Sequence, residues 1–268
     1  MAIPIDYQII PLTDLDAISN LKEHWLASLT RPQDGMWASF RDGAKYWGIQ
    51  SDNLFIGYAC ANEQQQLLQF YVLPKYLPQG ISLFEQFIEL TNIKHGVVGT
   101  NNPVFLSLAL HFAQSVEVHT YLFNDHFKVT LADRDGHLHQ CSPSDLERVV
   151  DFCHYSIGAP KEWLHQYIGG LIEKEEVFTF ENASETIGTC EVRKSISDPR
   201  FTDIGMIVSP DHRKKGYGTY LLHKAKTIAL DQGQTPICSC EKENIGSLKS
   251  IHNCGFRSIH QLLTFNFK

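Results

Sequence analysis

The sequence predicts an α/β protein made of two successive units that share one order of elements. A strand, a capped helix, three strands and then a helix–strand–helix succession occur once in each half. Glycine and proline residues also recur at matching places, since Ile56-Gly57 corresponds to Ile187-Gly188 and Val72-Leu73-Pro74 corresponds to Val208-Ser209-Pro210. A repeated order of elements with such matching residues is typical of a duplicated domain. We therefore predict one unit over residues 1–131 and a second over residues 132–268.

In the first half, short apolar runs bounded by turn residues mark the strands. Thr13-Asp14 has the character of a helix cap ahead of Leu15. Apolar residues at helical spacing predict one helix around residues 83–88 and another that begins at Pro103. Strands are expected at residues 7–12, 46–50, 54–60, 67–73, 96–100, 116–123 and 127–131.

The second half follows the same plan. Ser144-Asp145 takes the place of the earlier helix cap, and Trp163, Leu164, Tyr167 and Leu171 share one face of a later helix. The segment Asp133-Arg134-Asp135-Gly136 offers too few oxygen ligands for a calcium loop and is interpreted as a turn or linker. Strands are expected at residues 137–141, 177–180, 186–192, 202–208 and 238–240.

Residues 202–230 carry the most specific signal in the chain. A buried strand stops at Ser209-Pro210, because proline has no amide to give to a neighbouring strand. The basic loop Arg213-Lys214-Lys215-Gly216-Tyr217-Gly218 follows, and apolar residues from Leu221 onward then fall on one helical face. A helix N-terminus offers unpaired N–H groups and partial positive charge, so this order favours phosphate binding. If only the loop sequence is considered, the alternative to a phosphate site is a surface turn whose lysines face water.

The same segment resembles the acetyl-CoA loop of the GNAT N-acetyltransferase superfamily, in which V-x-P is followed by [RQ]-x-x-G-x-[GA]. Here that pattern is Val208-Ser209-Pro210 followed by Arg213 to Gly218. A second motif of the family, N-x-x-[AS] ending in G-F, is similar to Asn244, Ser247 and Gly255-Phe256. The resemblance covers the second half of the chain. It implies two tandem GNAT-like units of α/β (α+β) type, each a mixed, mostly antiparallel, twisted sheet flanked by helices.

For the second unit, the resemblance implies a set of acetyl-CoA contacts. The strand Met206-Ile207-Val208 is expected to splay from its neighbour and to pair with the pantetheine arm. Backbone amides are expected to wrap the pyrophosphate, with added charge from Arg213 and Lys215. Asn244 and Ser247 are expected to contact the same arm, although N-capping alone would explain both. The residues expected to wrap the pyrophosphate are Arg213, Lys214, Lys215, Gly216, Tyr217, Gly218 and Thr219.

The implied reaction is direct attack of an amine on the thioester, which needs a base for the amine and help for the leaving thiolate. The tyrosine that family members often use as the acid falls at Ile251, which cannot donate a proton. His252 and Cys254 are the nearby substitutes. If the amides of the site stabilise the thiolate, no dedicated acid is needed.

The candidate bases are two carboxylates on neighbouring strands. The glutamate that the family carries on its central strand falls at Thr202, so Asp203 lies one place away and Glu191 lies on the preceding strand. For both carboxylates, as for His252, a structural role is the alternative.

The first unit departs from the pattern where the cofactor is expected to bind. Aligned without gaps, it has Leu77 for Arg213, Pro78 for Lys214 and Ser82 for Gly218. Leucine supplies no charge and proline removes a backbone donor. We therefore expect a degenerate first copy, without a competent acetyl-CoA loop, and the match is worse still if its loop is shorter.

Composition narrows the function classes. A net charge of -7 argues against nucleic acid as a general partner, and no apolar run is long enough to span a bilayer. The seven cysteines are scattered without CxxC spacing, which favours reduced thiols in a cytoplasmic protein. No signal peptide is evident at the N-terminus. His137 and His139 alternate on a strand without a third ligand, so no metal is expected.

These observations predict an N-acetyltransferase that moves an acetyl group from acetyl-CoA to a primary amine of a small molecule or peptide. The alternative is a catalytically weak acyl-CoA sensor or regulatory module, and a third reading is a cleft for longer acyl groups or a protein amine. Residues 153–163 and 25–47 are the segments expected to choose the acceptor. A monomer or a homodimer is compatible with the tandem arrangement.

Overall fold

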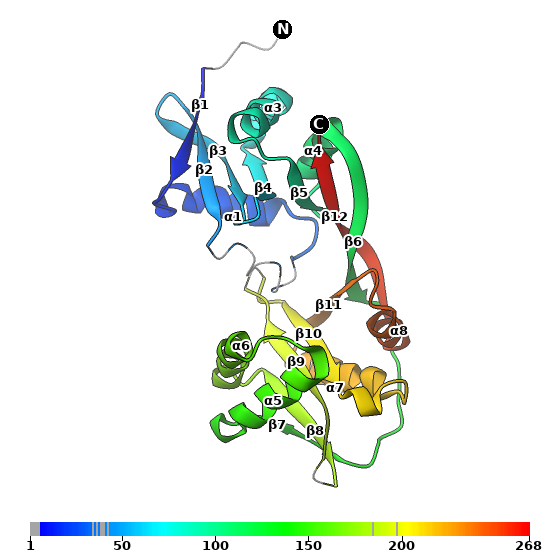
Figure 1. Cartoon of the computed structure of the whole chain (residues 1–268). Coiled ribbons are helices and arrows are strands. Elements are labelled where there is room, and N and C mark those ends of the chain that lie inside the picture. The colour runs from blue at the N-terminus through cyan, green and yellow to red at the C-terminus, as the bar shows by residue number, and fades with distance from the viewer. Residues whose placement is uncertain are drawn as a thin grey trace. The chain divides into compact units, whose positions relative to one another are not determined.

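The computed structural model describes residues 6–33, 35, 37, 41, 43–183, 185–196 and 198–268, and they form two compact units. Unit 1 contains the chain up to Tyr121 together with His260–Lys268, and unit 2 is Leu122–Ile259 (Figure 1). Both are mixed sheets with helices packed on them, as predicted. The last nine residues, 260–268, thus lie in the first compact unit, and the division of the chain into domains at residues 131 and 132 stays a prediction.

The sheet of unit 1 is antiparallel through its first four strands and then turns parallel. Strands β1 to β4 pair consecutively and antiparallel, whereas β5 lies parallel to β4. The C-terminal strand β12 pairs antiparallel with β5, from Leu262↔Gly99 to Asn266↔His95. Unit 1 contains β1 (Gln8–Leu12), β2 (Lys45–Ser51), β3 (Leu54–Ala61), β4 (Gln66–Val72) and β5 (His95–Gly99), together with the greater part of β6 (Ala113–Asp125) and of β12 (Phe256–Phe267).

Helices cover both faces of this sheet. α1 (Ser19–Ser28) packs Trp25 against a cluster that includes Tyr58 and Tyr71. On the other face, α3 (Gly80–Thr91) and α4 (Pro103–Phe112) bury aromatic side chains against the strands, and the rings of Phe70 and Phe84 meet edge to face at 4.8 Å. Short 3-10 turns, η1 (Asp16–Ile18) and η2 (Pro74–Gln79), precede α1 and α3.

Unit 2 repeats this plan with more helix on one face. β7 (His137–Gln140), β8 (Val177–Asn182), β9 (Glu185–Lys194) and β10 (Phe201–Val208) pair antiparallel in order, and β11 (Thr235–Glu241) lies parallel to β10. The helices are α5 (Leu146–Ile157), α6 (Lys161–Glu173), α7 (Tyr217–Asp231) and α8 (Ile245–Asn253), with short turns η3 (Pro143–Asp145) and η4 (Pro210–His212).

The two faces of this sheet carry different helices. The buried side chains of α5 and α6 form one cluster with Val177, against which Ile207 packs. α7 covers the other face, where the Leu221 side chain sits so close to Gly188 that a β-carbon there would lie 2.5 Å from it. The hydrophobic stripe predicted to begin at Leu221 is therefore the face that α7 buries.

The duplication is visible in the strand register. Gly57 pairs with Val72 in unit 1, and Gly188 pairs with Val208 in unit 2. At both glycines a β-carbon would meet the carbonyl oxygen of the residue before that valine, Tyr71 at 2.4 Å and Ile207 at 2.6 Å. Only glycine permits such a close approach of two strands, so the repeated Ile-Gly pair has the same packing cause in each unit.

One predicted strand is wrong. Residues 127–131 form no strand, because β6 ends at Asp125 and an irregular segment follows it as far as β7. Side chains of α7 bind its backbone, Lys226 Nζ at 2.9 Å from Phe127 O and His223 Nε2 at 2.8 Å from Val129 O. The apolar residues of this segment thus face a helix rather than a neighbouring strand.

Candidate functional site

The site in unit 2 begins where two parallel strands separate. β10 and β11 are paired from Phe201↔Thr235 to Asp203↔Ile237, and no pair follows. From Ile204 to Val208, β10 is paired only with β9 on its other side. The predicted splay of Met206-Ile207-Val208 from residues 238–240 is therefore present, and it leaves backbone groups on this edge of β10 without a strand partner.

The loop after β10 presents a row of unused amide donors. In the described part of the chain, the backbone amides of Lys214 through Thr219 donate to no protein acceptor. Lys214 has a φ of 61° and Gly216 has a φ of 82°, and such turns bring successive N–H groups to one side of the backbone. We refer to these amides of residues 214–219 as the amide cradle.

The amide cradle opens α7 and is accessible. Lys214, Lys215 and Gly216 are exposed, and Tyr217 and Gly218 are half-buried. The N-cap of α7 is Gly216, which has no side chain to cap the helix. Because the partial positive charge of the helix adds to the unpaired donors, the arrangement suits a phosphate group. The local sequence fixes this geometry, since glycine adopts a positive φ without steric cost.

Arg213 does not point into the amide cradle. Its Nη2 donates to Ser156 O at 2.5 Å, and its Nε donates to Val208 O at 3.3 Å. Tyr155 donates to Asp211 Oδ2 at 3.1 Å beside it, which raises the pKa of the tyrosine. Arg213, which was expected with Lys215 to add charge to the pyrophosphate site, therefore joins the loop to the end of α5, and Lys214 and Lys215 are the other exposed basic residues of the loop.

Arg134, a basic residue of the segment predicted as a turn or linker, lies at this loop. Arg134 Nη2 donates to Lys215 O at 2.9 Å, and the guanidinium lies over the ring of Tyr217. In the sequence, 81 positions separate Arg134 from Lys215, so no motif could have joined them.

α8 closes the other side of the amide cradle. Asn244 is the N-cap of α8, and its side chain accepts a hydrogen bond from Ser247 N at 3.1 Å. N-capping, the alternative to a cofactor contact, therefore describes the contact between these two residues. Asn102 caps α4 in the same way in unit 1. A β-carbon on Gly218 would lie 2.8 Å from Ser250 Oγ, so this glycine allows the start of α7 to approach α8 closely.

Of the two candidate bases, Glu191 lies nearer to the splayed part of β10. It pairs with Gly205, and its Oε2 lies 3.7 Å from the place where a β-carbon on Gly205 would stand. Tyr167 on α6 donates to the same oxygen at 2.6 Å, and Arg193 Nε lies 3.3 Å from it. Asp203 is 1% exposed and stands where the β10–β11 pairing ends.

The candidate acids lie on α8 and differ in exposure. Ile251 is buried, whereas His252 is exposed and meets the ring of Phe123 edge to face. Cys254 is fully buried, its Sγ donates to Thr219 O at 3.0 Å, and burial raises its pKa to about 12. A thiol so placed serves the packing between α7 and the end of α8. Thr202, at the family's glutamate position, is buried and donates to Gln234 Oε1 at 2.5 Å.

The corresponding loop of unit 1 is built differently, although β4 and β5 also separate after a short pairing. Residues 73–79 link Val72 to α3, one fewer than residues 209–216, which link Val208 to α7. The 3-10 turn η2 runs straight into α3, the amide of Gly80 donates to Leu77 O, and Pro78 has no amide. Gly80 is buried, whereas Gly216 is exposed. The first unit thus keeps the splay, but in its loop the Pro78 amide is missing and the Gly80 amide is already used.

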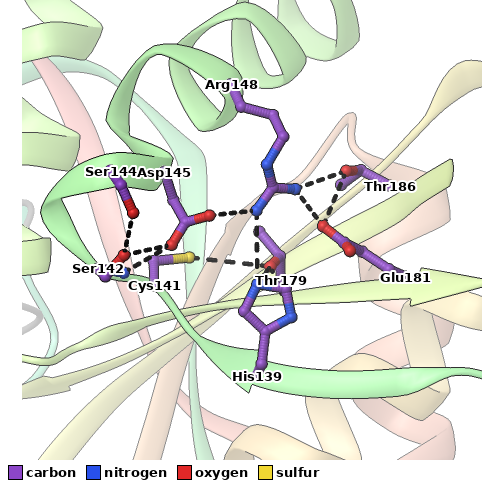
Figure 2. A network of polar contacts seen from close by, with 9 residues as sticks. All are labelled: His139, Cys141, Ser142, Ser144, Asp145, Arg148, Thr179, Glu181 and Thr186. Atoms are coloured by element: carbon purple, nitrogen blue, oxygen red, sulfur yellow. Dashed lines mark hydrogen bonds and ion pairs between the residues drawn. The ribbon is translucent and has the colours of Figure 1, made fainter. Parts of the chain in front are cut away.

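Of the two strand histidines, His139 belongs to a polar network at the β7 end of the sheet (Figure 2). Arg148 donates to Asp145 Oδ1 at 2.7 Å and to Thr186 Oγ1 at 2.9 Å, and it is also paired with Glu181. His139 Nε2 lies 2.8 Å from Thr179 Oγ1 in the same network. The network ties the start of α5 to β8 and β9. Among the described residues, no group of histidine, cysteine and carboxylate side chains is arranged to hold a metal.

None of the described helices combines the length and the apolar character that crossing a bilayer demands.

Comparison with known proteins identifies both halves. Residues 14–126 match one acetyltransferase (GNAT) domain model, and residues 128–257 match another. No curated protein matches the chain. Among solved structures, an acetyltransferase of the GNAT family from Colwellia psychrerythraea is 28% identical with a TM-score of 0.94, over 97% of this chain and 100% of that one.

More distant structures share the fold over the full length. A GCN5-related N-acetyltransferase from Sphaerobacter thermophilus is 14% identical with a TM-score of 0.68, covering 98% of this chain and 96% of that one. A tandem GNAT protein from the clavulanic acid biosynthesis pathway is 14% identical with a TM-score of 0.65, covering 97% and 98%. With one such domain in each half, the chain belongs to the GNAT acetyltransferase family as a tandem-domain member.

Proposed function

We propose that the protein is an acetyl-CoA-dependent N-acetyltransferase whose active site lies in unit 2. The observation that carries this proposal is the amide cradle beside the splayed end of β10. The unused amides of residues 214–219 suit the pyrophosphate of acetyl-CoA, and the free edge of β10 suits the amide groups of its pantetheine arm. Unit 1 lacks the open amides and serves as a degenerate copy.

The cofactor groups have defined partners in this proposal. Lys214 and Lys215 supply charge next to the pyrophosphate, while Arg213 keeps the loop tied to the end of α5. The carbonyl of the thioester lies at the splay, where Met206 and Val208 offer backbone N–H groups on the side of β10 that faces away from β9. Those donors polarise the carbonyl and stabilise the charge that develops as the amine attacks.

Glu191 is the carboxylate best placed to take the proton of the attacking amine. It is 8% exposed and lies over Gly205, at the part of β10 that has left β11. Tyr167 and Arg193 hold the carboxylate in place. Asp203 lies deeper and His252 is turned to solvent, so each ranks below Glu191 as the base or acid. The leaving thiolate is stabilised by site donors, because Ile251 has no proton to give.

The first experiment is a calorimetric titration of the purified protein with CoA, followed by acetyl-CoA with a panel of primary amines and detection of free thiol. We expect CoA binding with one site per chain and thiol release with at least one amine. Glu191→Gln should bind CoA like the parent protein and lose turnover about 100-fold or more. Absence of CoA binding would refute the proposal.

The second candidate is an acyl-CoA sensor, and the observation in its favour is Ile251 at the position of the usual tyrosine acid. The same titration separates the two candidates. Tight binding of CoA without thiol release across a broad amine panel identifies the sensor, and amine-dependent release identifies the enzyme.

A further inference from the structure

The guanidinium of Arg134 lies against the backbone of the amide cradle. Its Nη2 donates to Lys215 O at 2.9 Å, and its Cζ lies 4.5 Å from the ring centroid of Tyr217 and 6.0 Å from that of Tyr220. The side chain is half-buried, although the segment around it has no regular structure. A planar guanidinium that both donates and stacks is held in one orientation.

Gly216 makes room for this guanidinium. A β-carbon at residue 216 would lie 2.7 Å from Arg134 Nη2, closer than atoms approach without displacement. The φ of 82° at Gly216 independently favours glycine. The glycine thus lets the loop turn and also leaves space for an arginine from a distant part of the chain.

The contact decides where one cradle amide points. In a trans peptide the N–H and the C=O lie on opposite sides of the C–N bond. Because Arg134 holds the carbonyl of Lys215, the amide of Gly216 in the same peptide is directed away from the guanidinium, toward the open side of the loop.

We propose that Arg134 is a positioning residue for the pyrophosphate of acetyl-CoA, acting through the Lys215–Gly216 peptide. This rests on the proposed function, because it assumes that the amide cradle receives that pyrophosphate. The role belongs to the guanidinium as a planar group, since lysine carries the charge but cannot stack on Tyr217 and hold the carbonyl in the same way.

The test compares Arg134→Ala, Arg134→Lys and the control Arg200→Ala by calorimetry with CoA, dephospho-CoA and pantetheine. Arg200 is an exposed arginine of the same unit that pairs with Asp198. We expect Arg134→Ala to weaken CoA and dephospho-CoA each by about tenfold, which is the loss typical of one charge-assisted contact. Pantetheine binding should be unchanged, Arg134→Lys should recover only part of the loss, and Arg200→Ala should match the parent protein.

The outcomes separate this inference from the proposed function. If the parent protein binds neither nucleotide ligand, the proposed function fails. If the parent binds CoA and Arg134→Ala binds it equally well, only the role of Arg134 fails. A loss confined to CoA would assign Arg134 to the 3′-phosphate and overturn the pyrophosphate role. An equal loss for all three ligands with a lower melting temperature would make Arg134 merely structural.

Discussion

Replacing Gly255 by alanine should destabilise unit 2 far more than the same change at Gly233. Both glycines have a positive φ, 90° and 74°. A β-carbon at Gly255 would lie 2.2 Å from Phe127 O, whereas a β-carbon at Gly233 would meet no atom of the described residues within 4 Å. Gly233→Ala therefore measures the backbone cost alone, about 1 kcal/mol.

The larger cost at Gly255 comes from the contacts that must move. Its carbonyl accepts from His126 N at 3.2 Å and from Phe127 N at 3.0 Å, and Lys226 Nζ binds both Phe127 O and Cys254 O. Losing the two backbone hydrogen bonds at about 1 kcal/mol each, on top of the backbone cost, gives about 3 kcal/mol.

The assay is urea unfolding of both variants and the parent protein, followed by circular dichroism and tryptophan fluorescence. The free energy of unfolding should fall by about 3 kcal/mol for Gly255→Ala and by about 1 kcal/mol for Gly233→Ala. Equal losses in the two variants would refute the argument that the clash with Phe127, rather than the positive φ, requires glycine in this Gly-Phe pair.

Three further predictions concern the amide cradle, the polar network and the thiols. Gly218→Asp should abolish CoA binding, because the new side chain would collide with Ser250 and add negative charge at the start of α7. Leu77→Asp in unit 1 should bind CoA like the parent protein. If calorimetry shows that both variants bind CoA equally weakly, the first unit is not inert. Arg148 and the Ser142 amide hold the pKa of Asp145 well below its usual value, so its stabilisation is complete above about pH 4 and decreases as the pH falls further. Asp145→Asn should therefore lower the urea midpoint by more at pH 7 than near pH 2, and a pH-independent difference would refute this. Burial raises the pKa of three thiols to about 12, those of Cys60, Cys153 and Cys254. Iodoacetamide at pH 8 should therefore leave these thiols unmodified in the folded protein and alkylate them in urea. Rapid labelling without urea would contradict their burial.

Much of the candidate site was predictable because it is local. The stop at Pro210, the glycine at 216 and the start of α7 lie within a few residues, and their conformations depend mainly on their own backbone preferences. The splay of β10 followed from the resemblance to a known family. The role of Arg213 was not predictable, because its partner Ser156 lies at the end of a helix on another face of the sheet.

The wrong strand at residues 127–131 has a similar cause. Its apolar pattern is that of a buried strand, and a pattern of that kind reports burial without naming the partner. In the structure the burying surface is α7, with Lys226 and His223 binding the backbone carbonyls. These residues lie about 100 positions away, which sequence periodicity cannot span.

The sequence by itself determined the duplicated order of elements, the difference between the loops that follow β4 and β10, and the residues of the amide cradle. These features are encoded by neighbouring residues, through periodicity, glycine and proline. Only the tertiary structure decided that residues 260–268 complete the sheet of unit 1, that Tyr167 holds Glu191, and that Arg134 lies on the cradle. Those pairings are between segments distant in sequence, so they depend on the packing of the whole unit and leave no local pattern.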